Sequence, residues 1–449
     1  MFKKLAKLLI VTLIFNLKIF AQPIEIHYLD EIKKNYKYSS GNQIKFLPDG
    51  AEDYQIRTKM IDEAKKYVHL YTLLFEDNET GRETAIQLST KAFLEEVEVN
   101  VIHHALSQFF SSTPAITTAM RNMNVNVRGY WAKNTGINLI KRFLLGSHKK
   151  LLIVDSEKFG QEAIVGGRNI GDNYFKNVEN PVEGEFNNLW KDNDYLLRGP
   201  VVADLMKKYM VSFNEQTKED QYKLECLETT CNYFPKLIID ENENGFYSNI
   251  DISVLENEPT WKVFEINEVY GKLIDNAKVR IDIQTPYFIP SKKIFKKLVK
   301  ALERGVEVRI ITNSRDSNDL NKVVFYVSSY FWKKLIKKGA KVYIWYPPRG
   351  PNDKPKGYAG RCYHSKVMIV DSYVFVPGSW NFDNRSMKHD NEYAFPIYDK
   401  NVAKAGLAIF EGDLKLPGMT QIDLKWYKDN FSFWNKVFRR ISLLIKGIL

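Results

Sequence analysis

The chain has 449 residues, 44% of them hydrophobic and 27% charged, a globular composition that excludes a disordered chain and leaves room for two or three domains. Its formal net charge of +11 favours an anionic partner, either a nucleic acid or an acidic membrane surface. After the N-terminus no run approaches the roughly 20 apolar residues of a membrane-spanning helix, so any membrane contact must be peripheral or made through residues 1–21.

The N-terminus has the pattern of an export signal. It begins with basic residues, continues with an apolar stretch from Leu8 to Phe15, and reaches the small residue Ala21 at a plausible cleavage position. Asn16 and Lys18 interrupt the apolar stretch, so an uncleaved anchor in the membrane interface is the alternative. We therefore predict either a signal peptide or an N-terminal anchor in this segment.

Segments of the first half of the chain recur in the second half. A helix end that runs into an alternating strand occurs at 61–72 and again at 274–285, and a further strand pattern occurs at 96–102 and again at 305–311. Helices that alternate with strands predict right-handed crossovers. The predicted fold class is therefore α/β, with two homologous halves, each a mostly parallel sheet flanked by helices, packed with one shared active site.

The clearest repeat is a short motif in front of two buried-looking strands. Residues 148–155 read HKKLLIVD, and residues 364–371 read HSKVMIVD. A turn of small residues that ends in an asparagine follows each copy, GGRN ending at Asn169 and GSWN ending at Asn381. One such histidine is usually an ordinary strand residue, but two copies with the same continuation indicate a duplicated functional site. Cys362 precedes the second copy and is predicted to be structural.

The residue types of the motif suit phosphate chemistry. Histidine and lysine two positions apart point to one face of a strand, so two strands that meet at a pseudo-two-fold axis would bring both pairs and both asparagines around one cavity. The lysines and amides would stabilise nonbridging oxygens in the transition state. One imidazole would attack phosphorus while the other protonates the departing oxygen. This reaction needs no metal or cofactor, and the cysteines and histidines show no zinc-type spacing.

A polar segment at 218–258 is predicted as the linker between the first half, 22–217, and the second half, 259–430. It contains Cys226 and Cys231, for which a short disulfide and two free thiols are equally favoured. Because both halves are in one chain, we predict a monomer.

The C-terminal segment 431–449 is predicted as an amphipathic helix. Apolar side chains fall on one side at helical spacing, and most cationic side chains fall on the other. Such a helix can lie in the surface of an anionic phospholipid membrane; the alternative is a terminal helix packed on the protein core. The apolar side consists of Trp434, Val437, Phe438, Ile441, Leu444, Ile445 and Ile448, and the cationic side of Lys436, Arg439, Arg440 and Lys446.

The duplicated motif and its continuations resemble the phospholipase D superfamily over nearly the whole chain after residue 21. VGGRNIGDNYF at 165–175, ITNSRDSND at 311–319, GSWNFDNRS at 378–386 and the FSFW that begins the tail more narrowly resemble bacterial cardiolipin synthases of the type C branch. Those synthases often carry two N-terminal membrane helices, whereas this chain has one short apolar segment. We therefore expect attachment at the membrane surface or through residues 1–21.

The resemblance implies roles for individual residues. The two histidines would be the covalent and acid-base pair, and the lysines and asparagines would bind the phosphate. A carboxylate from the opposite half would orient each histidine, Glu392 for His148 and Asp192 or Asp194 for His364. The implied set is catalytic His148, Lys150, His364 and Lys366, substrate-binding Asn169 and Asn381, and supporting Asp155, Asp371, Asp192 and Glu392.

The implied activity is phosphatidyl transfer through a phosphohistidine on His148, making cardiolipin from phosphatidylglycerol and a second phospholipid. Hydrolysis that releases phosphatidic acid is the first alternative. A nuclease or another phosphodiesterase is the second, but no compact basic run outside helices indicates a strand-binding platform, so no nucleic acid partner is expected. The intact second motif argues against an inactive lipid-binding protein. We expect an exported, peripheral enzyme on the periplasmic face of the inner membrane, with the cytoplasmic face as the alternative.

Overall fold

The computed structural model divides the chain into two units, with the boundary between Asn35 and Tyr36. In the first unit it describes one helix, α2 (His27–Asn35). The predicted signal segment and the linker residues Cys226 and Cys231 lie outside the described residues. In the described part of the chain, no helix has the length and apolarity needed to cross a membrane. The described residues are 27–105, 113–132, 145–175, 190–216, 224–225, 233–240, 243–319, 322–348 and 361–447.

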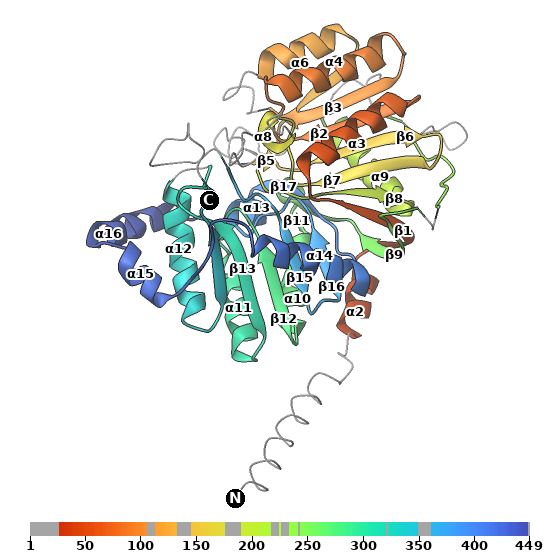
Figure 1. The fold of residues 1–449 in the computed structure, drawn as a ribbon. Helices are drawn as coiled ribbons and strands as arrows, with labels where there is room; N and C mark the ends of the chain where they lie inside the picture. Colours follow the sequence, from red (N-terminus) through yellow and green to blue (C-terminus); the bar gives the residue numbers. More distant parts are fainter. Residues whose placement is uncertain are drawn as a thin grey trace, which may run out of the picture. The chain divides into compact units, whose positions relative to one another are not determined.

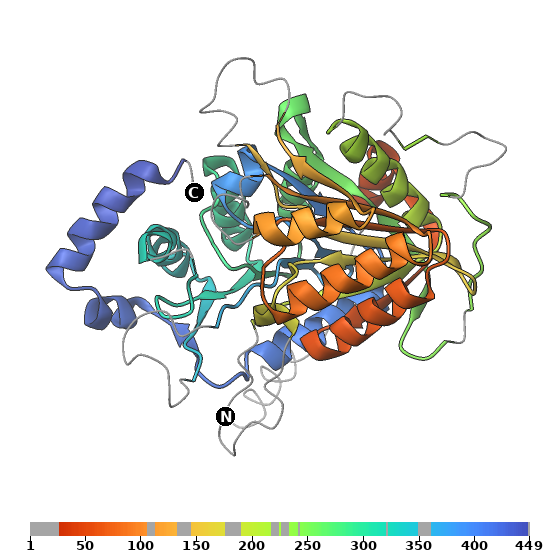
Figure 2. The same ribbon diagram turned by 90° about the horizontal axis from the view of Figure 1, so that it is seen from above.

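The first half of the larger unit is built on an eight-stranded sheet in the order β4-β3-β2-β6-β7-β8-β1-β9. Strands β2, β3 and β4 run parallel, and the other neighbouring pairs are antiparallel. Helices α3, α4 and α6 cover one face and α9 covers the other (Figures 1 and 2). The strands are β1 (Tyr38–Leu47), β2 (Tyr67–Thr72), β3 (Glu98–His104), β4 (Asn126–Tyr130), β6 (Leu151–Ser156), β7 (Gly160–Gly166), β8 (Asp194–Arg198) and β9 (Tyr247–Ser253), and the helices are α3 (Gly50–Glu63), α4 (Glu79–Phe93), α6 (Thr113–Asn122), α8 (Asp172–Phe175) and α9 (Pro200–Asn214).

Side chains of β2 alternate between two cores, as the two-residue period of a strand requires. Val68 and Leu70 pack in the core beneath α3 and α4. Tyr67 and Tyr71 pack in the core that includes α9 and side chains of the second half. Because both faces are covered, strands of this sheet read as nearly continuous apolar runs.

The second half is built on a six-stranded sheet in the order β16-β15-β12-β13-β14-β18. Strands β12, β13 and β14 run parallel and the remaining pairs are antiparallel. Helix α14 contributes to the core shared with the first half. The strands are β12 (Arg280–Gln284), β13 (Glu307–Asn313), β14 (Lys341–Trp345), β15 (Val367–Val370), β16 (Val374–Pro377) and β18 (Met419–Ile422), and the helices are α10 (Glu265–Asn276), α11 (Lys292–Glu303), α12 (Lys322–Ile336), α13 (Asn384–Lys388), α14 (Lys400–Asp413), α15 (Leu424–Asn430), α16 (Phe433–Ser442) and the 3₁₀ helix η3 (Leu443–Ile445).

The α/β class with two similar halves is confirmed, but the prediction of mostly parallel sheets is wrong because both sheets are mixed. The helix-strand repeats cover only the parallel triplets β2-β3-β4 and β12-β13-β14. After each motif strand the chain reverses through a tight turn, at 157–159 in the first half and 371–373 in the second. A strand that returns through so short a turn can only pair antiparallel, as β6 with β7 and β15 with β16 do.

The prediction of a linker over 218–258 is also wrong at its C-terminal end. Residues of β9 pair with β1 and complete the first sheet, while β10 (Leu255–Glu258) pairs with β17 (Asp390–Ala394) of the second half. β10 and β17 belong to a small sheet in the order β11-β10-β17-β5, with β11 at Val263–Phe264 and β5 at Gly146–Ser147. Strand β5 comes from the first half, so this sheet joins the two halves directly in front of His148.

Candidate active site

The two histidine-lysine pairs lie just before their strands. β6 begins at Leu151 and β15 at Val367, so the predicted alternation within a strand is wrong at the motif itself. Both lysines nevertheless turn back to their own histidines: Lys150 Nζ donates to the His148 carbonyl oxygen at 2.8 Å, and Lys366 Nζ lies 2.8 Å from Nδ1 of His364. The four side chains are buried, with exposed fractions of 3–8%.

The backbone of each histidine is held by the opposite half. Strand β5 pairs in parallel with β17, and the His148 N–H donates to the carbonyl oxygen of Asn391 at 2.8 Å. In the second motif the His364 N–H donates to the carbonyl oxygen of Lys191 at 2.7 Å, beside a bridge between Lys191 and Tyr363. Each motif therefore depends on the other half for its position. Lys150 and His148 of the first motif also lie near enough to His364 for their charges to lower its pKa, so the two motifs share one site.

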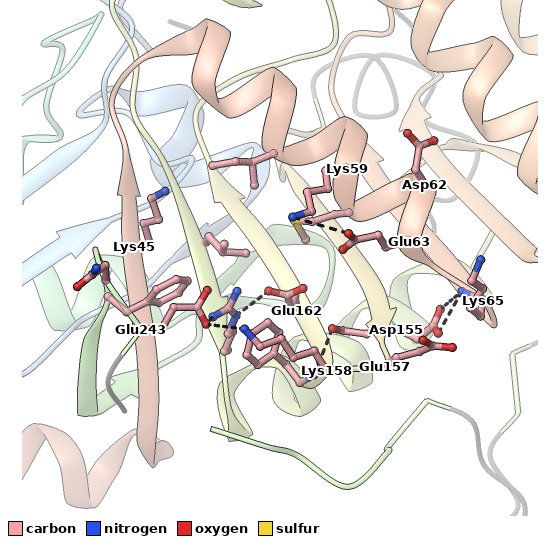
Figure 3. A pocket seen from close by; sticks show the side chains of 18 residues that line it. Lys45, Lys59, Asp62, Glu63, Lys65, Asp155, Glu157, Lys158, Glu162 and Glu243 are labelled. Atoms are coloured by element: carbon pink, nitrogen blue, oxygen red, sulfur yellow. Dashed lines mark hydrogen bonds and ion pairs between the residues drawn. The ribbon is translucent and has the colours of Figure 1, made fainter. Parts of the chain in front are cut away.

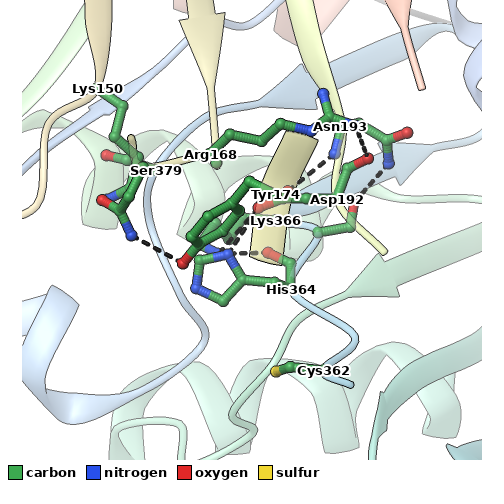
Figure 4. Close-up of polar contacts among 12 residues, drawn as sticks. Lys150, Arg168, Tyr174, Asp192, Asn193, Cys362, His364, Lys366 and Ser379 are labelled. Atoms are coloured by element: carbon green, nitrogen blue, oxygen red, sulfur yellow. Dashed lines mark hydrogen bonds and ion pairs between the residues drawn. The ribbon is translucent and has the colours of Figure 1, made fainter. Parts of the chain in front are cut away.

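Asp192 is the carboxylate beside His364. Its Oδ2 lies 2.6 Å from His364 Nδ1, where Lys366 Nζ also lies (Figure 4). A carboxylate can only accept hydrogen bonds, and Asp192 Oδ2 is nearer to Nδ1 than Lys366 Nζ is. We therefore place a proton on Nδ1, donated to Asp192, which leaves Nε2 free. Asp194 lies elsewhere: it accepts from Arg57 Nη2 at 2.5 Å and from the Gly167 N–H at 2.8 Å. Asp192, and not Asp194, is therefore the carboxylate that contacts His364.

His148 has a different environment. Its Nδ1 lies 2.9 Å from the Ser379 carbonyl oxygen and 3.2 Å from Glu392 Oε2. Glu392 is thus within reach, as expected, but the carbonyl oxygen is the closer acceptor. Glu392 also accepts from Ser386 Oγ at 2.6 Å and from Ser379 Oγ. Burial, with a contribution from the charge of Asp390, raises the pKa of Glu392 to about 8, although Lys150 opposes this shift.

The site concentrates positive charge away from water. Burial, and then the charge of Lys366, lower the pKa of Lys150 to about 7, and burial lowers the pKa of Lys366. Burial, followed by the charges of the two lysines, holds the pKa of both His148 and His364 well below the usual range. Cations that are this costly to bury are stabilised when an anion enters, so the site is suited to a phosphodiester.

The two turn asparagines are not equivalent. Asn169 Nδ2 donates to the Tyr174 hydroxyl at 2.8 Å, and its Oδ1 accepts from the Leu74 N–H at 3.3 Å. The Oδ1 of Asn381 is buried and has no hydrogen-bond partner among the described residues. The side chain of Asn169 is therefore engaged by the protein, whereas Asn381 retains unused hydrogen-bonding capacity. A contact of either residue with phosphate remains a prediction.

The motif aspartates lie at the far ends of their strands. Asp155 accepts from the backbone N–H groups of 65–67 at 2.9–3.2 Å, and Asp371 accepts from those of 278–280 at 2.7–2.9 Å. Asp155 also lines a cavity of about 640 Å³ on the first half that contains neither histidine of the motif (Figure 3). The geometry of both aspartates is that of structural support.

Several site residues were missed by the sequence patterns. The rings of Tyr174 and Trp190 lie 5.6 and 5.3 Å from the His364 ring. His104 approaches the other motif, because a Cβ on Gly146 would lie 2.4 Å from His104 Nε2. The glycine two residues before His148 was the available signal for this close approach. Cys362 is a buried free thiol whose pKa is raised by burial, and Figure 4 shows it apart from the histidine-lysine cluster.

Comparisons with known proteins agree with this arrangement. Residues 270–414 match the family model described as cardiolipin synthase, PLD-like domain. The chain is 26% identical to the major cardiolipin synthase of Bacillus subtilis over 95% of this chain and 79% of that protein, and 26% identical to a cardiolipin synthase of Clostridium perfringens over 95% and 82%. Among solved structures, phosphatidylserine synthase of Haemophilus influenzae superposes with a TM-score of 0.66 at 16% identity, covering 94% of this chain and 99% of that one. This last similarity concerns the fold.

Proposed function

The chain belongs to the phospholipase D superfamily, and from this premise we propose that it transfers a phosphatidyl group through a phosphohistidine, making cardiolipin from phosphatidylglycerol and a second phospholipid. The observation that carries the proposal is the crossing of the two halves, which brings two buried histidine-lysine pairs into one cationic site. The named relatives, cardiolipin synthases that match 95% of the chain, supply the substrate class.

In the first step Nε2 of His148 attacks phosphorus. The hydrogen bond from Nδ1 to the Ser379 carbonyl oxygen keeps the lone pair on Nε2. A P–N bond forms and the bond from phosphorus to the departing alcohol breaks, while His364 gives its Nε2 proton to that alcohol oxygen. Lys150 and Lys366 stabilise the nonbridging oxygens as charge develops on them.

His364 must carry a proton before this step, although burial and the lysine charges lower its pKa. An anionic phosphodiester offsets the lysine charges, and Asp192 at 2.6 Å stabilises the imidazolium. Binding of substrate therefore favours the protonated form of His364.

In the second step a hydroxyl of phosphatidylglycerol attacks the phosphatidyl-histidine. His364, now neutral, takes the hydroxyl proton; the new P–O bond forms and the P–N bond breaks, which restores both histidines. Burial of the two histidines, at 8% and 4% exposure, supports an alcohol from a bound lipid as acceptor over bulk water. With water as acceptor, the same steps would release phosphatidic acid.

We further propose that the enzyme works as a peripheral protein on an anionic phospholipid membrane. The net charge of +11 supports an anionic membrane surface as partner, and the signal-like pattern of the first 21 residues supports export to the periplasmic face of the inner membrane. Protease protection of the protein in intact spheroplasts would place it on the cytoplasmic face instead.

The decisive experiment incubates the purified protein with phosphatidylglycerol vesicles and resolves the lipid and alcohol products. Cardiolipin with release of glycerol is expected, and addition of phosphatidylethanolamine shows whether ethanolamine is released as well. Activity should persist in EDTA. Phosphatidic acid as the main product would support hydrolysis, and cleavage of oligonucleotides without turnover of lipid would contradict both lipid reactions.

A further inference from the structure

Exposed apolar side chains are concentrated at the C-terminal end of the second half. In the described part of the chain, fifteen large hydrophobic side chains are exposed, and six of them lie between residues 424 and 444. Isolated exposed hydrophobic residues are normal, but a contiguous group marks a contact surface. We call this group the α15–α16 surface; it consists of Leu424, Phe433, Trp434, Phe438, Ile441 and Leu444, with exposed fractions of 41–84%.

Helix α16 packs on α12 with its more polar side. The Tyr326 hydroxyl of α12 donates to Asn435 Oδ1 at 3.0 Å, the Arg439 guanidinium lies 5.3 Å from the centre of the Phe431 ring, and Ser442 is buried. Phe438 alone of the α15–α16 surface makes an edge-to-face ring contact with Tyr326, at 4.9 Å. Helix α16 therefore packs on α12, as the alternative of a packed terminal helix expects, but it leaves most of its apolar side exposed.

The tail that carries this apolar face also carries exposed cations. Lys436, Arg440 and Lys446 are exposed, and no salt bridge from them to an acidic side chain occurs among the described residues. Burial, followed by the positive charges of Arg439, Lys337 and Lys436, lowers the pKa of Lys333 on α12. Mutual repulsion among these cations is relieved by an anionic surface.

The tail also reaches the catalytic region. Asn384 Nδ2, in α13, donates to the Lys446 carbonyl oxygen at 2.8 Å. On the same short helix, Ser386 Oγ donates to Glu392, the carboxylate near His148. Figures 1 and 2 show α15 and α16 beside α12, with the end of the tail near α13. Helix α13 thus contacts both the end of the tail and the glutamate beside His148.

We propose that the α15–α16 surface docks on an anionic phospholipid bilayer, with its aromatic and aliphatic side chains in the interfacial layer and its cations among the lipid headgroups. Aromatic rings beside lysine and arginine suit this layer, since the rings prefer the headgroup level and each cation gains attraction to anionic lipid. The proposal rests on the proposed function only in that the same bilayer would hold the substrates. Docking through this surface places the catalytic region next to the lipid headgroups.

The test measures flotation of the full-length chain with vesicles, in a His148→Asn background so that turnover cannot alter the lipids. Phe433→Glu with Trp434→Glu should lower the partition onto phosphatidylglycerol-containing vesicles about tenfold or more, because two rings that would enter the bilayer interface are replaced by two negative charges that the anionic surface repels. Phe93→Glu with Leu94→Glu is the matched control, since these adjacent residues at the end of α4 are 50% and 70% exposed; it should bind as the parent does.

Parent binding should fall with added salt and be weak on phosphatidylcholine vesicles. Equal binding by the tail variant and the parent would overturn the proposal, as would an equal loss in the α4 control or equal binding to the two vesicle types. Thermal unfolding of each variant checks the fold. If the double variant unfolds, the single substitution Trp434→Gln replaces it, since Trp434 is 75% exposed. Because binding is read without catalysis, failure of the proposed function leaves this result unaffected.

Discussion

Asp192 of the first half lies 2.6 Å, through Oδ2, from Nδ1 of His364 in the second half. The corresponding contact across the pseudo-two-fold axis, from Glu392 to His148, is 3.2 Å long, and a carbonyl oxygen lies closer at 2.9 Å. A close carboxylate favours an imidazolium, whereas a carbonyl acceptor holds a neutral ring in one tautomer. The asymmetry supports His364 as the acid and His148 as the nucleophile in an otherwise duplicated site.

Asp192→Asn should therefore lower kcat by about 10²-fold or more, the range of a lost acid-base contribution, with little change in Tm. The loss should shrink on a phosphatidyl ester with an activated leaving group, because that group departs without protonation. Asp194→Asn is the matched control: it breaks the buried contacts to Arg57 and Gly167, and should cost about 3–5 kcal/mol of stability. Reversed effects of the two variants would place the orienting carboxylate at Asp194.

Glu392 should make stability depend on pH. Its pKa rises from 4.5 to about 8 in the folded protein, so between these values the folded state holds a proton that the unfolded chain has released. The free energy of unfolding attributable to this group then falls as pH rises through that window. Glu392→Gln cannot titrate, and its Tm should fall less between pH 5 and 8 than that of the parent. Parallel Tm curves for the two proteins would contradict the assignment.

Lys149, the residue between His148 and Lys150, should act as a structural clamp. Its buried ammonium lies 2.7 Å from Glu256 Oε1, contacts Glu258 as well, and sits 4.3 Å from the centre of the Tyr393 ring. Lys149→Met would leave two half-buried carboxylates without this partner, of which Glu256 keeps Lys208, and should cost about 3 kcal/mol in urea unfolding.

Ser365 occupies the equivalent place in the second motif and accepts one hydrogen bond from Asn193, at 2.7 Å. Ser365→Ala should cost only about 1 kcal/mol. A Lys149→Met variant no less stable than Ser365→Ala would show that the clamp contributes little.

Asp371→Asn tests the motif aspartates. It removes the charge that binds three successive N–H groups before β12, and should lower stability by about 1–3 kcal/mol. Because these contacts lie at the far end of β15 from His364, kcat of the folded fraction should stay within a few-fold of the parent. A loss of kcat with unchanged Tm would mean that the aspartate acts on the reaction itself.

The local patterns predicted more of the site than of the topology. The two histidine-lysine strings could be found because the duplicated halves carry the same short patterns. The carboxylates at Asp192 and Glu392 were implied by the resemblance to the phospholipase D superfamily. The antiparallel return of β7 and β16 could not, since helix-strand repeats carry no information about a hairpin that follows them.

Long-range contacts decided the remaining features. The carbonyl oxygen of Ser379 next to His148 depends on how the two halves cross, and no side-chain pattern encodes it. In the tail, periodicity predicted an amphipathic helix correctly, but the contact between Tyr326 and Asn435 determines which side packs. The sequence therefore specified the chemical groups, while their unequal geometry came from the fold.

Trapping of the covalent intermediate shows whether the two histidines share one site and divide the roles of nucleophile and acid. A phosphatidyl ester with an activated leaving group is mixed with His364→Asn and His148→Asn proteins, quenched and mapped by mass spectrometry. We expect a phosphatidyl adduct on His148 in the His364→Asn protein, because the activated group leaves without an acid, and none in the His148→Asn protein. An adduct on His364 in the His148→Asn protein, with none in the other, would contradict this division of roles.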